Sequence, residues 1–147
     1  MLRRSLLAAS IALFGCSGGE HELSADPAQQ AAPDVEDAKS AALEWLELVD
    51  EGDYGESWDE AAELFRGAVA KEQWARQVGG VRGPLGDVES REVSSATAHR
   101  SVPGAPDGDY VVIEYRTRFE NKSSAVETVT PMRDPDGTYR VSGYYVR

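Results

Sequence analysis

The chain has 147 residues and a formal net charge of −11, from 26 acidic and 15 basic residues, and it contains one cysteine. Such acidity argues against nucleic-acid binding, which needs basic side chains that displace counterions from phosphates, and against electrostatic docking on anionic lipid. A single cysteine excludes an intrachain disulfide and a cysteine-based zinc site. The two histidines, His21 and His99, are too far apart in sequence to predict a metal site, and no motif indicates a cofactor.

The first 16 residues have the pattern of a lipoprotein signal peptide. Arg3 and Arg4 precede an apolar run over residues 6–14, and Gly15 stands directly before Cys16. A transmembrane helix needs about 20 apolar residues, so this run is too short to be one. The pattern resembles a bacterial lipobox, in which the signal peptide, here residues 1–15, is cleaved and the cysteine is acylated. We therefore expect lipidation of Cys16.

The residues around the cysteine also bear on where the protein resides. Ser17 resembles the pattern that directs lipoproteins of Gram-negative bacteria to the outer membrane, so we expect a lipid-anchored protein of the cell envelope that faces the periplasm. Phe14 is bulky for its lipobox position, which leaves a plain secreted or soluble periplasmic protein as the alternative. Residues 16–34 are too poor in apolar side chains to fold and predict a disordered acidic tether. Residues 35–147 predict a single α+β domain.

The acidic residues are concentrated in the first half of the chain. Residues 17–66 contain 15 acidic and two basic residues, whereas the acidic and basic residues balance from residue 67 onward. The excess therefore lies on the tether and the first expected helices. On the sequence alone, solubility and repulsion from the bilayer explain this charge better than a dedicated site for a cation or a basic partner.

Three amphipathic helices are expected at the start of the domain. Apolar residues recur at steps of three and four over residues 35–49. A second apolar stripe covers residues 54–65, with Asp53 and Glu56 spaced as a capping box, and a shorter third helix is expected over residues 71–78. Each expected helix carries one tryptophan on its apolar stripe, and aromatic residues in this position more often belong to the core than to a ligand cage.

Four strands are expected to follow. The first, over residues 87–102, has weak alternation, which indicates a bulge or bend. Clear alternation predicts a second strand over residues 109–119, and turn residues separate it from strands over residues 125–132 and 138–146. Short connections between successive strands favour antiparallel neighbours, so the last three strands are expected to form a meander. The predicted fold is α+β, with three N-terminal helices packed on a curved four-stranded antiparallel sheet.

Several short segments carry a family resemblance. They are Gly52-Asp53-Tyr54 with Ser57-Trp58, Pro84-Leu85-Gly86, Pro103-Gly104-Ala105-Pro106-Asp107-Gly108, Glu127-Thr128-Val129-Thr130 and Gly143-Tyr144-Tyr145. Together they resemble a bacterial family, domain of unknown function four-zero-one-nine, over residues 35–147. The order of helices and strands also looks like the cone of the nuclear transport factor 2-like, or cystatin-like, superfamily. The family resemblance implies no catalytic residues.

A non-enzymatic role is the function that we favour. In it, the anchored domain binds an envelope protein, peptide or small ligand, or assists assembly, without catalysis. Tyr115, Tyr139 and Tyr145 are the candidates to line a pocket between sheet and helices, although such residues more often fill the core.

A small enzyme is the alternative, because the superfamily includes ketosteroid-isomerase-like members that use a carboxylate base and a tyrosine. Glu127 is the candidate carboxylate, since it shares strand parity with Val129 and is expected to point into the cone. With no catalytic motif matched, we favour a structural or solvated role for Glu127, with Arg116 or Arg140 as the expected ion-pair partner in the structural case.

Overall fold

The first helix, α1, spans Val35–Glu51 and has a clear capping residue at each end. The Asp34 side chain accepts hydrogen bonds from the backbone N–H groups of Glu36 and Asp37, at 3.0 and 3.2 Å, as an N-cap does. Gly52 ends the helix with φ of 83°, a left-handed conformation that glycine adopts without strain. The expected apolar stripe is buried: Ala38, Ala42, Trp45, Leu46 and Val49.

The computed structural model describes residues 33–147. The predicted signal peptide, Cys16 and all but the last two residues of the predicted tether lie outside the described residues. At the boundary, the backbone N–H of Asp34 donates a hydrogen bond to the Tyr139 hydroxyl at 3.1 Å, so Asp34 already belongs to the folded domain. Within residues 33–147, no helix combines the length and the apolar character needed to cross a membrane.

The second expected helix is in fact two short ones, so residues 33–147 contain four helices and not three. Helix α2 spans Tyr54–Asp59 and α3 spans Glu63–Ala68. Between them the backbone N–H of the fully buried Ala62 donates to the carbonyl oxygen of Val141 at 2.9 Å. This bond to a strand replaces the bond that would continue the helix. Asp53 is the N-cap residue of α2, as expected, but the predicted capping box was wrong, because the Asp53 side chain makes no capping hydrogen bond.

Helix α4 spans Lys71–Leu85 and continues well past its expected end at Val78. Residues 83–85 form its last turn, and Gly86 is its C-cap residue. Its buried residues, Trp74, Val78 and Arg82, recur every four positions. The stripe therefore continues through an arginine, which a search for apolar periodicity does not count.

The four expected strands form one antiparallel sheet in the order β1-β2-β3-β4, which confirms the α+β class and the meander predicted for the last three strands. The same meander also includes β1. Their bounds are β1 Val88–His99, β2 Tyr110–Phe119, β3 Lys122–Arg133 and β4 Tyr139–Val146. The register of β1 against β2 shifts twice, between Val88 and Ser90 and between Val93 and Ser95. The weak alternation of this strand therefore does mark bulges, as predicted.

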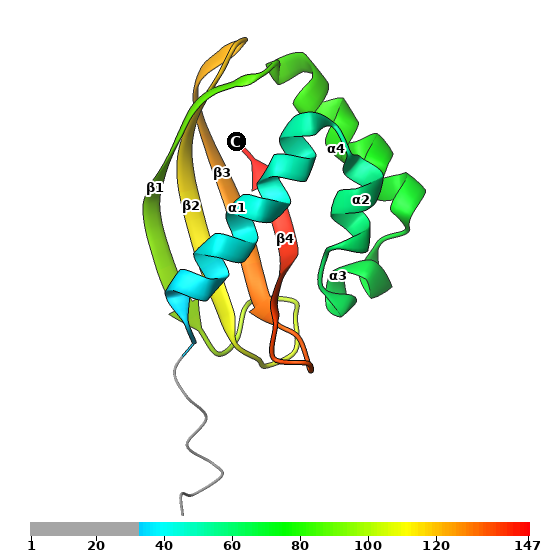
Figure 1. Ribbon diagram of the computed structural model, residues 1–147, viewed down its shortest axis with the longest axis vertical. Helices are drawn as coiled ribbons and strands as arrows, with labels where there is room; N and C mark the ends of the chain where they lie inside the picture. Colours follow the sequence, from blue (N-terminus) through cyan, green and yellow to red (C-terminus); the bar gives the residue numbers. More distant parts are fainter. Residues whose placement is uncertain (1–32) are drawn as a thin grey trace, which may run out of the picture. The chain divides into compact units, whose positions relative to one another are not determined.

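Helix α1 crosses one face of the sheet and contacts all four strands, while α2 packs against α4 and α3 contacts β4 (Figure 1). Trp45 and Trp74 are buried in the core between these layers, and Trp58 packs against it. The indole N–H of Trp45 donates to the Ser57 carbonyl oxygen at 2.7 Å, and that of Trp74 donates to the Ser57 hydroxyl at 3.0 Å. The tryptophans thus join α1, α2 and α4, as their predicted core role requires.

Candidate functional site: a buried ion-pair cluster and an acidic groove

Glu127, the sequence candidate for a catalytic carboxylate, is fully buried on β3. Its Oε2 accepts hydrogen bonds from Arg91 Nε at 2.7 Å and from the Thr117 hydroxyl at 2.5 Å. Its Oε1 accepts from the Tyr144 hydroxyl at 2.7 Å and from Arg91 Nη2 at 3.1 Å. The side chain therefore points into the interior, and four donors from three strands surround it.

Asp50, at the end of α1, completes an ion-pair cluster around this carboxylate. Arg91 Nη1 lies 2.7 Å from Asp50 Oδ2, so Arg91 joins Asp50 to Glu127. Arg82 reaches the same group from α4: its Nη2 lies 2.7 Å from Asp50 Oδ1 and its Nη1 lies 3.7 Å from Glu127 Oε1. We call these four residues, with Tyr144, the buried cluster after Glu127 and Arg82, which are buried; Arg91 and Tyr144 are half-buried, and Asp50 lies at the exposed edge of the cluster. Its two carboxylates and two guanidinium groups balance in formal charge.

The ion-pair partners that the sequence suggested for Glu127 are not the observed ones. Arg116 is exposed, opposite Glu92 in the β1–β2 register. Arg140 pairs with Asp134 at 3.1 Å and with Asp136 at 2.9 Å. The charges that neutralise Glu127 come instead from α4 and β1.

Contacts within the buried cluster shift the pKa values of Asp50, Arg91 and Tyr144. Burial disfavours the ionised form of Asp50, but hydrogen bonds from Arg91 and Arg82 outweigh it and lower the pKa of Asp50 below its ordinary value. Burial likewise disfavours the charged form of Arg91, but its bonds to Asp50 and Glu127 raise its pKa. Burial and the nearby Glu127 charge raise the pKa of Tyr144, so its hydroxyl keeps its proton.

This geometry suits a structural role for Glu127 better than a catalytic one. A carboxylate offers about four lone-pair directions, and four donors already occupy them. A general base needs a lone pair directed at the proton that it removes. Substrate access would therefore require the loss of at least one of these bonds.

The three candidate pocket tyrosines do not meet in one pocket. Tyr115 lies in the hydrophobic core; its buried hydroxyl has no hydrogen-bond partner among the described residues, and burial raises its pKa to about 12. Tyr139 is also buried, but it borders a groove beside α1. Tyr145 is 51% exposed and borders a separate, shallow apolar pocket formed with α4 residues such as Val81.

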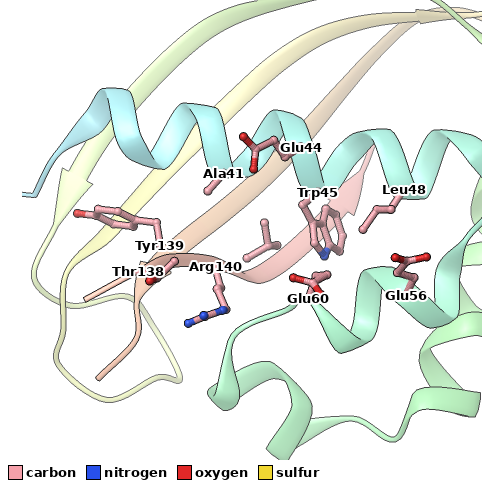
Figure 2. Close-up of a pocket in the computed structure, with 10 residues that line it drawn as sticks. Ala41, Glu44, Trp45, Leu48, Glu56, Glu60, Thr138, Tyr139 and Arg140 are labelled. Atoms are coloured by element: carbon pink, nitrogen blue, oxygen red, sulfur yellow. The ribbon is translucent and has the colours of Figure 1, made fainter. Parts of the chain in front are cut away.

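The groove at Tyr139 lies between α1, β4 and the α2 segment and has a volume of about 370 Å³. Figure 2 shows Glu44, Trp45 and Leu48 along α1, with Glu56 and Glu60 across the opening. Its apolar lining residues are Ala41, Trp45, Leu48 and Val141, beside the ring of Tyr139. An adjoining pocket shares several lining residues and extends the concave surface to Asp37 near the start of α1. We call this continuous surface the acidic groove.

The carboxylates of the acidic groove are exposed and free of ion pairs. Glu44, Glu56 and Glu60 make no ion pair within residues 33–147. Arg140 also lines the groove, but Asp134 and Asp136 already neutralise its charge. No group of three or more potential metal-ligating side chains occurs in the described part of the chain. The surface is thus negative without having the converging ligands of a metal site.

Of the residues that line the groove, Tyr139 alone was a pocket candidate from the sequence. The property of the sequence that could have pointed to the groove glutamates is the excess of acidic residues in the first half of the chain. That signal could not separate the three groove glutamates from the other acidic residues of α1 and α2, because their grouping depends on how the two helices pack.

Comparison with known proteins agrees with the resemblance found in the sequence. The model of the family described as Protein of unknown function (DUF4019) matches residues 41–144. This range includes all five residues of the buried cluster and the three groove glutamates. A search of curated proteins finds no match to the chain. The chain therefore belongs to the DUF4019 family.

Proposed function

We propose that this protein is a non-enzymatic binding module of the bacterial cell envelope, held by lipid on Cys16 and spaced from the membrane by residues 16–34. The observation that carries the proposal is the contrast between two sets of carboxylates. Glu127 is buried and surrounded by donors, whereas Glu44, Glu56 and Glu60 are exposed around a groove. The Glu127 carboxylate has no lone pair free to accept a proton from a substrate, whereas the three groove carboxylates are accessible to a ligand.

We also propose that the domain is a nuclear transport factor 2-like cone with a filled interior. The position of α1 across the sheet and the bulges in β1 support this interpretation. Bulky side chains from both layers occupy the interior, including Tyr115, Ile113 and Leu46, each at most 1% exposed. A filled cone provides a rigid support for surface binding.

The anchor is tested by comparing wild-type protein with Cys16→Ala in a Gram-negative host. With a clickable palmitate analogue, we expect label on the wild-type chain only. In fractionation, the wild-type chain should be found with outer-membrane vesicles and Cys16→Ala should lose this association. Equal labelling and equal fractionation of the two proteins would reject the anchored module in favour of a secreted or soluble periplasmic domain.

The enzymatic alternative rests on proximity: a tyrosine hydroxyl, Tyr144, lies next to the Glu127 carboxylate inside the domain, and here it occupies one of the carboxylate lone pairs. Complementation of a deletion strain distinguishes the two functions. Once folded protein levels are matched, Glu127→Gln should complement as the wild type does, while Cys16→Ala should fail. Failure of Glu127→Gln at matched levels would favour the enzyme.

A further inference from the structure

We propose that the acidic groove binds an extended segment of a partner protein, in which basic residues alternate with apolar ones. This inference deepens the proposed binding function and rests on it. It identifies the surface used and the chemistry of the partner. Three properties of the groove support it: its length, the charge on its two walls and its apolar floor.

The length of the groove suits a short extended segment. The combined surface runs along α1 from Asp37 to Leu48. At about 1.5 Å per helical residue, this is roughly 16 Å. An extended chain rises about 3.3 Å per residue, so about five residues span the groove.

The charges face the groove from both sides. Glu44 belongs to α1, Glu56 to α2, and Glu60 is the C-cap residue of α2. A segment between the two walls would therefore place lysine or arginine side chains near carboxylates on either side. Because these carboxylates are free of ion pairs among residues 33–147, no existing pair must break first.

The floor favours a partner with apolar side chains over a simple polycation. Trp45 and Leu48 line the α1 side of the groove, and Val141 also lines it. Trp45 and Val141 are 3% and 1% exposed and form its base, while the half-buried Leu48 offers the accessible apolar surface. An apolar side chain seated there would remove water from both surfaces, which a polyamine or a metal ion cannot do to the same extent. An anionic membrane surface is disfavoured because it carries the same charge as the groove.

The test uses the full mature chain and four probes of defined chemistry. The first is a blocked hexapeptide of alternating lysine and leucine with a fluorescent label. In the second, serine replaces leucine; in the third, glutamate replaces lysine; the fourth is spermine, added as a competitor. We expect saturable binding of the lysine–leucine peptide, clearly weaker binding of the lysine–serine peptide, no binding of the glutamate–leucine peptide and poor competition by spermine.

A matched pair of triple variants locates the site. The groove variant combines Glu44→Gln, Glu56→Gln and Glu60→Gln. The control variant combines Glu47→Gln, Glu51→Gln and Glu72→Gln, which remove the same charge from exposed helical positions that do not line the groove. If each exposed contact contributes about a factor of two, the groove variant should bind the lysine–leucine peptide roughly ten-fold more weakly. The control variant should stay within about two-fold of the wild type.

Several outcomes would overturn the inference. No binding of the lysine–leucine peptide would reject it outright. Equal loss in both triple variants would show that net charge alone attracts the peptide. Equal affinity for the lysine–serine peptide, or efficient competition by spermine, would show that the apolar floor plays no part. None of these results would affect the labelling and fractionation of Cys16, so a failure here remains distinct from a failure of the anchored-module proposal.

Discussion

The hydroxyl of Tyr144 lies 2.7 Å from Oε1 of Glu127, although strand parity counted from Val141 places Tyr145, and not Tyr144, on the inner face. The β3–β4 register explains the difference. Thr130 is paired with Gly143, whereas the next residue of β3, Pro131, is paired with Val141. The shift inserts one extra residue into β4, and a single extra residue exchanges the two faces of the strand beyond it.

The consequence is that the buried cluster joins most parts of the fold. Asp50 comes from α1, Arg82 from α4, Arg91 from β1, Glu127 from β3 and Tyr144 from β4. The two helices that the cluster links, α1 and α4, are separated in the chain by α2 and α3. Of the strands that it links, β1 and β4 are the two edges of the sheet. Such a network fixes the relative position of the layers when every member is present, and removal of one member leaves a buried charge without its partner.

Replacing Glu127 by glutamine should therefore destabilise the domain strongly. The substitution keeps the size of the side chain but leaves Arg91 and Arg82 with one carboxylate between them, so we expect a loss of about 3 kcal/mol in the free energy of unfolding. Urea denaturation measures it. Glu89→Gln is the control: its carboxylate is exposed, 4.0 Å from Arg118, and should change stability by less than about 0.5 kcal/mol. Similar small effects from both substitutions would contradict the structural role of Glu127.

Adjacent tyrosines on β4 should respond differently to loss of the hydroxyl. Tyr144→Phe removes a hydrogen bond to a buried carboxylate, which contributes about 1.5 to 3 kcal/mol to stability. Tyr145 is half exposed, and Tyr145→Phe should stay within about 0.5 kcal/mol of the parent. Comparison of the two urea midpoints tests the bulge itself, because the order of the two effects would reverse if β4 kept regular alternation.

The parts of the fold that follow from local patterns could be predicted from the sequence. The apolar stripe of α1, ending at Gly52, and the alternation of β2 were sufficient to place these elements, because each pattern is set by neighbouring residues. The break between α2 and α3 was not predictable in this way. It depends on the bond from Ala62 to Val141, which joins residues far apart in the chain.

The buried cluster was missed for a related reason. Arg82 and Arg91 occupy inward positions, but a charged residue in an isolated helix or strand pattern indicates the solvent-facing side. Only the simultaneous presence of Asp50 and Glu127 makes their burial favourable. Glu127 itself was correctly expected to point inward from strand parity, since no bulge separates it from Val129.

Two neighbouring glycines in α4 should differ in their response to alanine. A Cβ at Gly80 would meet no atom within 4 Å, whereas one at Gly79 would lie 3.2 Å from Cε2 of Tyr54. Because alanine is the better helix former, Gly80→Ala should stabilise the domain by about 0.5 to 1 kcal/mol. Gly79→Ala should gain less or lose stability, because the Tyr54 ring must move. Thermal unfolding of the two variants checks the order, and an equal gain in both would show that α2 does not pack this closely on α4.

Acid should weaken the buried cluster through Asp50. Burial opposes its ionisation, but bonds from Arg91 and Arg82 dominate and lower its pKa from the ordinary 3.8. A carboxyl group whose pKa is lower in the folded state contributes stability that is present above the unfolded-state pKa and is lost as pH falls through the folded-state pKa. The loss from this group should therefore begin near pH 4 and continue below it.

Urea unfolding of wild-type protein and Asp50→Asn, measured from neutral pH down to about pH 2, tests this assignment. Asparagine cannot ionise, so Asp50→Asn should be less stable than the wild type at neutral pH, and the difference between them should shrink as the pH falls below 4. Asp136→Asn serves as the comparison, because Asp136 also has a lowered pKa, of about 2, from its bonds to Arg140 and Thr138, but its side chain is 54% exposed. Solvent screening should make its effect on stability much smaller. If the free energies of unfolding of the wild type and Asp50→Asn changed in parallel with pH, the ion pairs of Asp50 with Arg82 and Arg91 would not stabilise the folded state.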